Sequence, residues 1–519
     1  MSSSAHVERL FCALEAEPEK TAIEFEGRSF TFGELDFLSR RYARGLAAAG
    51  LERGDRVAVF SETSPEIIVA LLGHYRLGAI HVPINTRYRA SEVAHILEDS
   101  GAKALLLRAG SSCAGVVHGL QPPPATLEFR IWMGAGESSA GPGDLSFDSL
   151  TEMSRSARET PLPDDEDAAI LLYTSGTTGR SKGVALPFRA IVANTDSVTK
   201  LWRFSPGDTM ALALPLFHVH GLCLGVHGAL LHRMPILLFE RFEALRIAEA
   251  FASGEASLFQ GVPTMYVKLL ELLAGSPEAG RALARGRLFT SGSAALAAGD
   301  FARFEELTGH RILERYGMSE TLFTLSNPYD DRRPGTVGLP IPGCDVRIVD
   351  EAGKDAAADE PGEILVKGSG MMTGYWRRPE ETAASFRDGW FATGDMARRD
   401  RAGYVTIAGR KSVDFIKSGG FKISAREIED VLRVHPRVKD VAVVGAPDRV
   451  WGERIVAAVV LQPAAGPPPS PEALLDELSA FCAQSLADYK RPREVSIVED
   501  LPRNALGKVQ KHRILEELK

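Results

Sequence analysis

The sequence predicts an α/β protein in which parallel strands alternate with helices. Residues 56–60, 80–84 and 104–107 are short apolar runs typical of buried strands, and stretches with helical periodicity separate them. The chain has 519 residues, more than one hydrophobic core usually holds, so we expect roughly two to four subdomains. Its composition, 45% hydrophobic and 25% charged, is that of an ordinary globular protein.

The N-terminal segment carries local signals for a hairpin and a helix. Residues 21–32 alternate in the manner of two short strands joined by a turn. Thr31, with Glu34 three residues later, has the pattern of a capping box and predicts a helix through Leu46. Further helices are predicted at residues 65–77 and, capped by Ser91, at residues 91–97.

Charge and cysteine usage exclude some classes of function. The net charge is −8, from 60 Lys and Arg against 68 Asp and Glu, whereas a general nucleic-acid binder has a basic balance. The five cysteines are far apart and form no C-x-x-C pair, so we expect buried free thiols in a reducing cytoplasm. The N-terminus lacks the apolar core of a signal peptide. The most apolar window, residues 210–239, contains histidines, an arginine and prolines, which favours core strand and helix over a membrane span.

The most informative stretch is the loop TSGTTGRSKG at residues 174–183. Apolar runs at residues 168–173 and 184–186 predict strands on either side of it. Its three glycines let backbone N–H groups converge on an anion, and its hydroxyls, Arg180 and Lys182 add donors and positive charge. The spacing is not that of a Walker A motif. The composition therefore predicts a polyphosphate-binding loop, with a solvated Ser/Gly/Thr turn as the alternative.

The string SGTTGRSKG closely resembles the phosphate-binding loop of the adenylate-forming superfamily, which comprises acyl-CoA synthetases, luciferases and adenylation domains of peptide synthetases. Four further signatures follow in the family's order: YGxxE at 316–320, TGD at 393–395, GR at 409–410 and PxxxxGK at 502–508. The resemblance implies a large N-terminal domain, residues 1–410, made of α/β subdomains and a β-barrel-like part. It also implies a small mobile α+β domain, residues 411–519, joined by a hinge and carrying the catalytic lysine.

The resemblance assigns ATP and Mg²⁺ to particular residues. The phosphate contacts fall on Thr174, Ser175, Gly176, Thr177, Thr178, Gly179 and Lys182. The contacts to adenine and α-phosphate fall on Gly292, Ser293, Ala294, Tyr316, Gly317 and Thr321, and the ribose contacts on Asp395 and Arg410. Glu320 is the implied Mg²⁺ ligand, because a carboxylate beside phosphates suits that ion.

The implied reaction has two steps. A carboxylate attacks the α-phosphorus of ATP to give an acyl-adenylate and pyrophosphate, and a thiol, CoA, then attacks the acyl carbon and releases AMP. Lys508 is the implied catalytic cation of the first step, with Thr174, Glu320 and His218 as the other catalytic residues. Lys417, Gly419 and Gly420 are expected to line the tunnel for CoA. Because one orientation of the small domain cannot serve both steps, rotation about Ser412 is expected.

The two histidines of LPLFHVHG, His218 and His220, permit three interpretations. A metal site is disfavoured because no third ligand lies nearby at metal spacing, and both residues could be core histidines. The resemblance gives the third: His218 borders the carboxylate and the thiol tunnel, and both line the substrate site with Met318.

Several segments resemble malonyl-CoA synthetases in particular: LPLFHVHGL, FQGVPTMY, RLFTSGSAAL and LERYGMSETL. In that group the arginine matching Arg287 pairs with the distal carboxylate of malonate, which predicts malonate or another small dicarboxylate as substrate. The alternative for Arg287 is a surface ion pair at a strand entry. Phe323 and Leu325 are more apolar than that group's pattern, which leaves a fatty or aryl acid as alternative substrate.

Two other classes of function were weighed. An adenylation enzyme loading a carrier protein is disfavoured because no carrier domain follows in the sequence, although a separate carrier protein remains an alternative acceptor. A non-enzymatic nucleotide-binding module is disfavoured because ATP binding alone needs no counterpart of Lys508.

Overall fold

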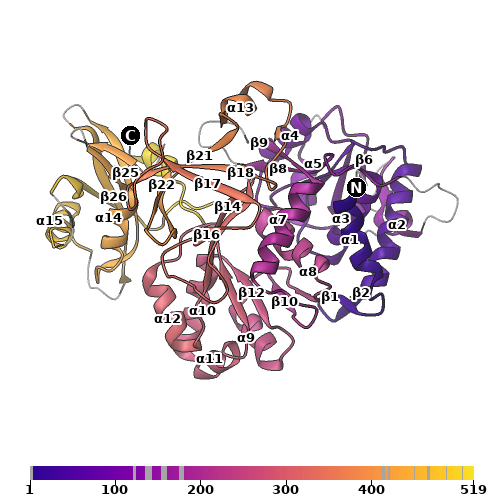
Figure 1. Ribbon diagram of the computed structural model, residues 1–519, viewed down its shortest axis with the longest axis horizontal. Coiled ribbons are helices and arrows are strands. Elements are labelled where there is room, and N and C mark those ends of the chain that lie inside the picture. Colours follow the sequence, from indigo (N-terminus) through magenta and orange to yellow (C-terminus); the bar gives the residue numbers. More distant parts are fainter. Residues whose placement is uncertain are drawn as a thin grey trace. The chain divides into compact units, whose positions relative to one another are not determined.

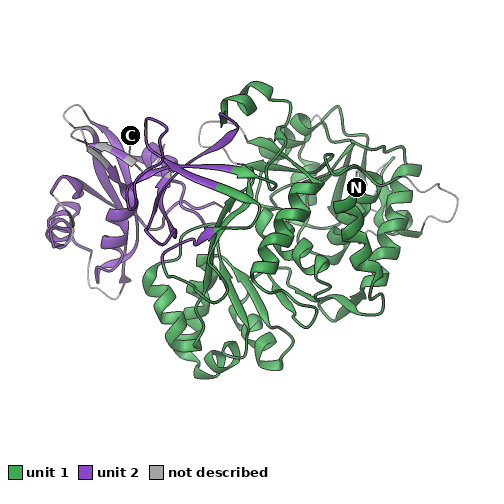
Figure 2. Ribbon diagram, in the orientation of Figure 1, with its two compact units in different colours: residues 1–334, 340–345, 367–386 green, residues 335–339, 346–366, 387–519 purple. Residues whose placement is uncertain are grey.

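The computed structural model confirms a mixed α/β protein (Figure 1). It describes residues 4–120, 124–134, 143–152, 161–174, 181–410, 415–418, 421–448, 451–463, 468–484, 486, 488–504 and 507–518. The chain forms two compact units (Figure 2). Unit 1 comprises residues 1–334, 340–345 and 367–386, and unit 2 comprises residues 335–339, 346–366 and 387–519.

An eight-stranded sheet of unit 1 presents the predicted phosphate loop. Its strand order is β19-β9-β8-β4-β3-β5-β6-β7. The strands are β3 (Arg56–Val59), β4 (Ile80–Pro83), β5 (Ala104–Arg108), β6 (Phe129–Met133), β7 (Leu145–Ser146), β8 (Ala168–Thr174), β9 (Lys182–Pro187) and β19 (Gly374–Tyr375). The strands from β8 to β7 are parallel, whereas β9 runs antiparallel to β8. The two strands expected to flank the loop are thus direct neighbours.

The helices of this region largely follow the sequence signals. They are α2 (Phe32–Ala48), α3 (Pro65–Leu77), α4 (Ala90–Ser100), α5 (Ser112–His118) and α6 (Phe147–Glu152). The capping box of α2 is confirmed: the Thr31 hydroxyl accepts from the Glu34 N–H, and the Glu34 carboxylate accepts from the Thr31 N–H. The predicted Ser91 cap is wrong, because α4 begins one residue earlier and Glu92 instead accepts from the Arg89 N–H at 2.8 Å.

A nine-stranded sheet of unit 1 carries the remaining predicted residues of that unit. Its order is β16-β15-β14-β13-β12-β10-β11-β1-β2, and the strands from β14 to β1 are parallel. The strands are β1 (Thr21–Phe25), β2 (Arg28–Thr31), β10 (Met210–Leu212), β11 (Ile236–Leu238), β12 (Leu258–Gly261), β13 (Leu288–Ser291), β14 (Leu313–Met318), β15 (Leu322–Ser326) and β16 (Leu339–Pro340). Strands β1 and β2 form the predicted hairpin.

Helices cover this sheet, and one face is defined by aromatic contacts. Helix α10 (Pro263–Gly275) packs Tyr266 against Phe259 of β12, and α12 (Ala298–Thr308) packs Phe304 against Phe289 of β13. The other helices of unit 1 are α1 (Ala5–Glu15), α7 (Phe188–Leu201), the π-helix η1 (His220–His227), α8 (Gly228–Leu231), α9 (Ala244–Ser253), α11 (Pro277–Leu283) and α13 (Pro379–Ala384).

The apolar window at residues 210–239 contains β10, η1, α8 and β11. This confirms the prediction that the window forms core strands and helices. Among the described residues, no helix is both long and apolar enough to cross a bilayer. All five cysteines are free; four are buried as expected, whereas Cys12 is exposed.

Two five-stranded sheets complete the fold. The first, order β17-β18-β21-β20 with β22 beside β21, forms the half-barrel part. It comprises β17 (Cys344–Val349), β18 (Gly362–Gly368), β20 (Phe386–Arg387), β21 (Trp390–Arg399) and β22 (Val405–Arg410). The second, order β24-β23-β26-β25 with β27 beside β26, comprises β23 (Phe415–Ser418), β24 (Phe421–Ser424), β25 (Val438–Asp448), β26 (Gly452–Leu461) and β27 (Glu494–Ile497). It is accompanied by α14 (Ala425–Leu432), α15 (Pro471–Cys482), the 3₁₀ turn η3 (Asp488–Lys490) and α16 (Lys511–Glu517).

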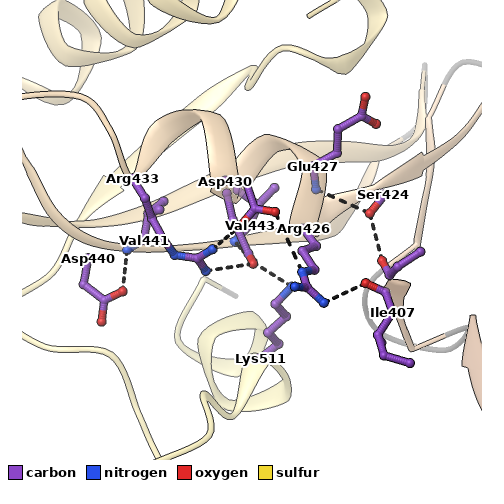
Figure 3. Close-up of polar contacts among 12 residues, drawn as sticks. Ile407, Ser424, Arg426, Glu427, Asp430, Arg433, Asp440, Val441, Val443 and Lys511 are labelled. Atoms are coloured by element: carbon purple, nitrogen blue, oxygen red, sulfur yellow. Dashed lines mark hydrogen bonds and ion pairs between the residues drawn. The ribbon is translucent and has the colours of Figure 1, made fainter. Parts of the chain in front are cut away.

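Hydrogen bonds of α14 cross the predicted domain boundary at residues 410 and 411. The Ser424 hydroxyl donates to the Ala408 carbonyl at 3.0 Å, and the Arg426 guanidinium donates to the Ile407 carbonyl at 2.6 Å (Figure 3). The donors and the acceptors of these two bonds all belong to unit 2, because the last continuous segment of that unit runs from residue 387 to residue 519. The boundary at residue 410 therefore stays a prediction about motion.

A buried glutamate of α14 ties the last helix to this sheet. Glu429 is 6% exposed, and its Oε1 accepts from the Val443 N–H at 2.8 Å and lies 2.7 Å from Lys511 Nζ. Its Oε2 lies 3.2 Å from Arg433 Nη2. The buried Glu429 carboxylate thus forms ion pairs with two cations and accepts a hydrogen bond from one backbone N–H.

We expect Glu429→Ala to lower the free energy of unfolding by about 3 kcal/mol, because it removes a buried carboxylate that pairs with Lys511 and accepts from the Val443 N–H. Asp430→Ala is the matched control: its side chain, on the same helix, is 56% exposed in its pair with Arg433, and the expected loss is below about 1 kcal/mol. Denaturant unfolding of the full chain measures both, and equal losses would contradict a special role for the buried pair.

Three buried histidines, His74, His81 and His227, lie together, and His227 is the last residue of the π-helix η1. His74 Nδ1 lies 3.0 Å from His81 Nδ1, and His227 Nε2 accepts from the Tyr75 hydroxyl at 2.9 Å while its Nδ1 donates to the Leu222 carbonyl. Burial lowers the pKa of His74 to about 3 and that of His227 to about 4. Burial also lowers the pKa of His81. All three are therefore neutral in the folded protein near neutral pH.

This cluster predicts a loss of stability in mild acid. In the unfolded chain the same imidazoles titrate near their ordinary pKa of about 6.5, so below that pH the unfolded state binds more protons. Stability should therefore fall from pH 6.5 down to about pH 4, by up to about 2 kcal/mol per histidine between pH 7 and pH 5. Unfolding temperatures between pH 7 and pH 5 measure this, and His74→Leu should reduce the slope; an unchanged slope would contradict the assignment.

Candidate active site

The predicted phosphate loop lies between two antiparallel neighbours, β8 and β9. Thr174, the last residue of β8, is paired in register with Lys182, the first of β9. Lys182 forms an ion pair with Glu381, and its Nζ lies 5.4 Å from the centre of the Tyr375 ring. The predicted contacts Ser175, Gly176, Thr177, Thr178 and Gly179 lie outside the described residues. Both ends of the loop are thus fixed where the sequence predicted them.

The YGxxE signature forms the turn of the β14–β15 hairpin. A Cβ at Gly317 would lie 1.9 Å from the Leu322 carbonyl oxygen, so only glycine fits this turn. The backbone irregularity there lies between Tyr316 and Gly317. The half-buried Tyr316 lies beside Met318, with its hydroxyl 4.0 Å from the Met318 sulfur. The hairpin therefore presents Tyr316 and Met318 together at one end of the sheet.

The predicted Mg²⁺ ligand is buried and oriented. Glu320 is 7% exposed, its Oε1 accepts from the Tyr375 hydroxyl at 3.1 Å, and its carbonyl accepts from the Met372 N–H. Thr321 is fully buried, and its hydroxyl lies 2.9 Å from that of Thr324. One oriented carboxylate fits a magnesium ion that takes its other ligands from phosphates and water. Tyr375 is a contact that sequence reasoning missed, since it lies 55 residues from Glu320.

The two histidines lie at the carboxyl ends of the parallel strands of the nine-stranded sheet. Gly292 and Ser293 follow β13, and the Ser293 hydroxyl lies 3.4 Å from His220 Nδ1, with Ser293 in the left-handed region at φ 68°. Burial lowers the pKa of His218 to about 4, and burial followed by the charge of Arg315 lowers the pKa of His220. Both imidazoles are therefore neutral near neutral pH. Ala294 is exposed.

No group of three or more His, Cys, Asp or Glu side chains within the described residues is arranged to hold a metal ion.

Arg315 of β14 is the residue that sequence reasoning missed. It is 6% exposed, and its Nε and Nη2 have no hydrogen-bond partner among the described residues. Its guanidinium lies over Gly292, where a Cβ would come within 2.6 Å of Arg315 Cζ, and 4.8 Å from the centre of the Phe323 ring. Burial lowers its pKa to about 9, so it is still charged at pH 7. Its position directly before Tyr316 of the YGxxE signature was the signal that could have found it.

Arg287 lies just before β13, at the opposite end of that strand from Gly292. Its Nε and Nη2 each donate to a carboxylate oxygen of Asp208 at 2.7 Å. Burial tends to raise the pKa of Asp208, but the bonds from Arg287 hold it below its ordinary value. Asp208 precedes β10, which runs in the same direction as β12 and β13, so the pair sits at the amino-terminal edge of the sheet. At about 3.3 Å per residue this is roughly 16 Å from Gly292.

Unit 2 carries the other predicted residues. Asp395 lies on β21, 8% exposed, and its N–H donates to the Thr393 hydroxyl. It is paired in register with Arg410 of β22, so the structure brings the backbones of the two predicted ribose contacts together. Lys417 lies on β23, which pairs with β24 as an antiparallel hairpin. The side chains of Arg410 and Lys417, and the residues Ser412, Gly419 and Gly420, lie outside what the structure describes.

Lys508 projects from a braced turn. Its N–H donates to the Asn504 side chain at 2.9 Å, and its carbonyl accepts from the Asn504 N–H at 2.8 Å. Gly507 takes φ 78°, and its carbonyl accepts from Arg503 at 2.5 Å. Three residues after Lys508, Lys511 forms the buried pair with Glu429. The backbone of Lys508 is therefore bonded to Asn504 in both directions.

Family models match most of the chain. Residues 11–376 match the AMP-binding enzyme family, and residues 427–508 match the AMP-binding enzyme C-terminal domain. The chain belongs to the AMP-binding enzyme family. It is an AMP-forming acyl-CoA synthetase, an acid–CoA ligase that uses ATP and CoA.

Relatives of this enzyme differ in the acid that their names give. It is 32% identical to malonate–CoA ligase of Arabidopsis thaliana, over 96% of this chain and 86% of that one. It is 33% identical to long-chain-fatty-acid–CoA ligase of Bacillus subtilis, over 96% and 92%. The crystal structure of ATP-bound MatB from Rhodopseudomonas palustris superposes with a TM-score of 0.88 at 36% identity, covering 98% of each chain.

Proposed function

We propose that this acyl-CoA synthetase activates a small dicarboxylate, with malonate as the simplest candidate. The observation that carries the proposal is Arg315, a charged guanidinium 6% exposed whose Nε and Nη2 lack partners among the described residues. A buried cation is costly unless an anion pairs with it, and a planar guanidinium suits a carboxylate in a bidentate arrangement. A substrate with a second carboxylate supplies that anion.

The proposal moves the contact for the distal carboxylate from Arg287 to Arg315. Arg287 is already neutralised by Asp208 at the far edge of the sheet, so the alternative of an ion pair at the strand entry describes it better. Phe323, which favoured a fatty or aryl acid as a sequence signal, is here a ring stacked against the Arg315 guanidinium. The Phe323 ring therefore stabilises the Arg315 charge rather than lining an apolar pocket, which is an argument against a fatty acid as substrate.

For the adenylation step we propose the roles that the resemblance implied. Thr174, Lys182 and the loop between them hold the β- and γ-phosphates, and Tyr316 lies against the adenine. Glu320 would hold Mg²⁺, which neutralises phosphate charge when bound. Lys508 bridges the carboxylate and the α-phosphate, where charge develops in the transition state. His218, neutral because burial lowers its pKa, borders the carboxylate without repelling a cation beside it.

For the second step we propose that residues 411–519 turn about Ser412 and that Lys417, Gly419 and Gly420 line the path of the thiol. That motion has a structural cost in this chain: the bonds from Ser424 to the Ala408 carbonyl and from Arg426 to the Ile407 carbonyl must break. Asp395 and Arg410 hold the ribose in both steps.

A panel of acids tests the substrate proposal directly. AMP release with CoA present should be fastest with malonate or another short dianion, and slow with propionate, which has the same carbon count and no distal anion. Faster turnover of long-chain or aryl acids than of any short dianion would overturn it. Comparing thioester formation with CoA and with a carrier protein as acceptor distinguishes a CoA ligase from an enzyme that loads a carrier protein.

A further inference from the structure

Arg315 shares its face of the sheet with a buried amide. In the parallel register Gln260 of β12 is paired with Thr290 of β13, and Ser291 with Glu314 of β14. Side chains alternate along a strand, so Gln260, Thr290 and Arg315 point to one face. Phe259 and Phe289 point to the other, where they pack against α10 and α12. The amide therefore lies on the face that carries the proposed anion contact.

The side-chain amide of Gln260 has no hydrogen-bond partner in the described part of the chain. It is 1% exposed, and both Nε2 and Oε1 lack partners among the described residues. Thr290, directly opposite, is also 1% exposed, and its hydroxyl is likewise unpartnered, so the two side chains do not satisfy each other. A buried amide left unpaired costs free energy, and such groups in a substrate site are normally matched by the ligand.

The oxygen of this amide distinguishes between possible ligands. A carboxylate only accepts hydrogen bonds, so the distal anion of malonate can satisfy Arg315 and the N–H groups of Gln260 but not Oε1. The methylene of malonate offers no donor either. A hydroxyl on the carbon next to the distal carboxylate both donates and accepts, so it can serve Oε1 and Nε2 or the Thr290 hydroxyl.

We propose that the preferred acid is a short dicarboxylate that carries a hydroxyl beside its distal carboxylate, recognised through Gln260. This inference rests on the proposed function, since it places the hydroxyl relative to the carboxylate held by Arg315. The chemical class is that of hydroxymalonate and malate, and Gln260 is the residue that sets the preference for the hydroxyl.

The test compares kcat/KM for hydroxymalonate and malonate in the full-length enzyme. We expect hydroxymalonate to be preferred by about 10- to 100-fold, because a site built to bond a hydroxyl discriminates against the analogue that lacks it. Gln260→Met, which keeps the length and removes the amide, should bring the ratio of the two kcat/KM values close to one, because the loss falls mainly on hydroxymalonate. The ratio is internal to each enzyme sample, so partial loss of folded protein does not alter it.

The outcomes separate this inference from the proposed function. Equal or faster turnover of malonate by the wild-type enzyme overturns the inference, even if Gln260→Met does not fold, while leaving the dicarboxylate assignment intact. A wild-type preference that survives in Gln260→Met also overturns the role of Gln260. Failure of every dicarboxylate, with good turnover of monocarboxylates, overturns the proposed function itself. Malate, one carbon longer, should follow hydroxymalonate in its dependence on Gln260.

Discussion

Arg315→Met is expected to lower kcat/KM for malonate by about 100-fold or more, while turnover of propionate is unchanged or improved. Removing one partner of a buried, hydrogen-bonded charge pair typically costs about 2–5 kcal/mol, and each 1.4 kcal/mol is a factor of ten. Propionate has no distal charge, so it loses nothing and gains an apolar surface in the Met side chain. The measurement is the malonate-to-propionate ratio of kcat/KM. Arg315→Lys, which keeps the charge but not the planar fork, should fall between the two.

Arg287→Met is the matched control for this experiment. It removes a guanidinium of the same size from the other end of β13 and leaves Asp208, whose side chain is 5% exposed, without its counter-charge. We expect reduced thermal stability with an unchanged substrate ratio. The opposite pattern, a changed ratio in Arg287→Met and none in Arg315→Met, would restore the original prediction for Arg287.

Lys508→Ala is expected to lower the rate of adenylate formation by about 100- to 1,000-fold, the usual effect of losing one contact to developing transition-state charge. Thioester formation from preformed acyl-adenylate and CoA should stay within a few fold of the wild-type rate, because the lysine is proposed to act only in the first step. Pyrophosphate exchange measures the first step, and thioester yield from synthetic acyl-adenylate measures the second.

A matched variant separates the charge of Lys508 from the shape of its turn. Asn504→Ala removes the side chain that accepts from the Lys508 N–H, so it should also slow adenylation, by a smaller factor and again without affecting thioester formation. Equal damage to both half-reactions by Lys508→Ala would contradict the division of labour between the two steps.

Local pattern was sufficient to predict much of the fold. The alternation of strands and helices at residues 56–107, the hairpin at residues 21–32 and the capping box at Thr31 all depend on contacts within a few residues, and the structure confirms them. The Ser91 cap failed because Arg89 and Glu92 made an equally local arrangement that begins the helix earlier. The other site residues were predicted from the family resemblance. Its five signatures, found in the family's order, indicate which distant residues should come together.

Sequence signals alone predicted the α/β adenylate-forming fold, the strands on either side of the predicted phosphate loop, and the position of Lys508 beside Gly507. The surroundings of its two arginines depend instead on long-range contacts. Arg287 and Arg315 are equally charged in the sequence, but parallel strands place Asp208 beside the first and leave Nε and Nη2 of the second without a partner among the described residues. Whether a charged side chain has an ion-pair partner depends on residues that the fold brings from distant strands. A local sequence pattern does not show these residues.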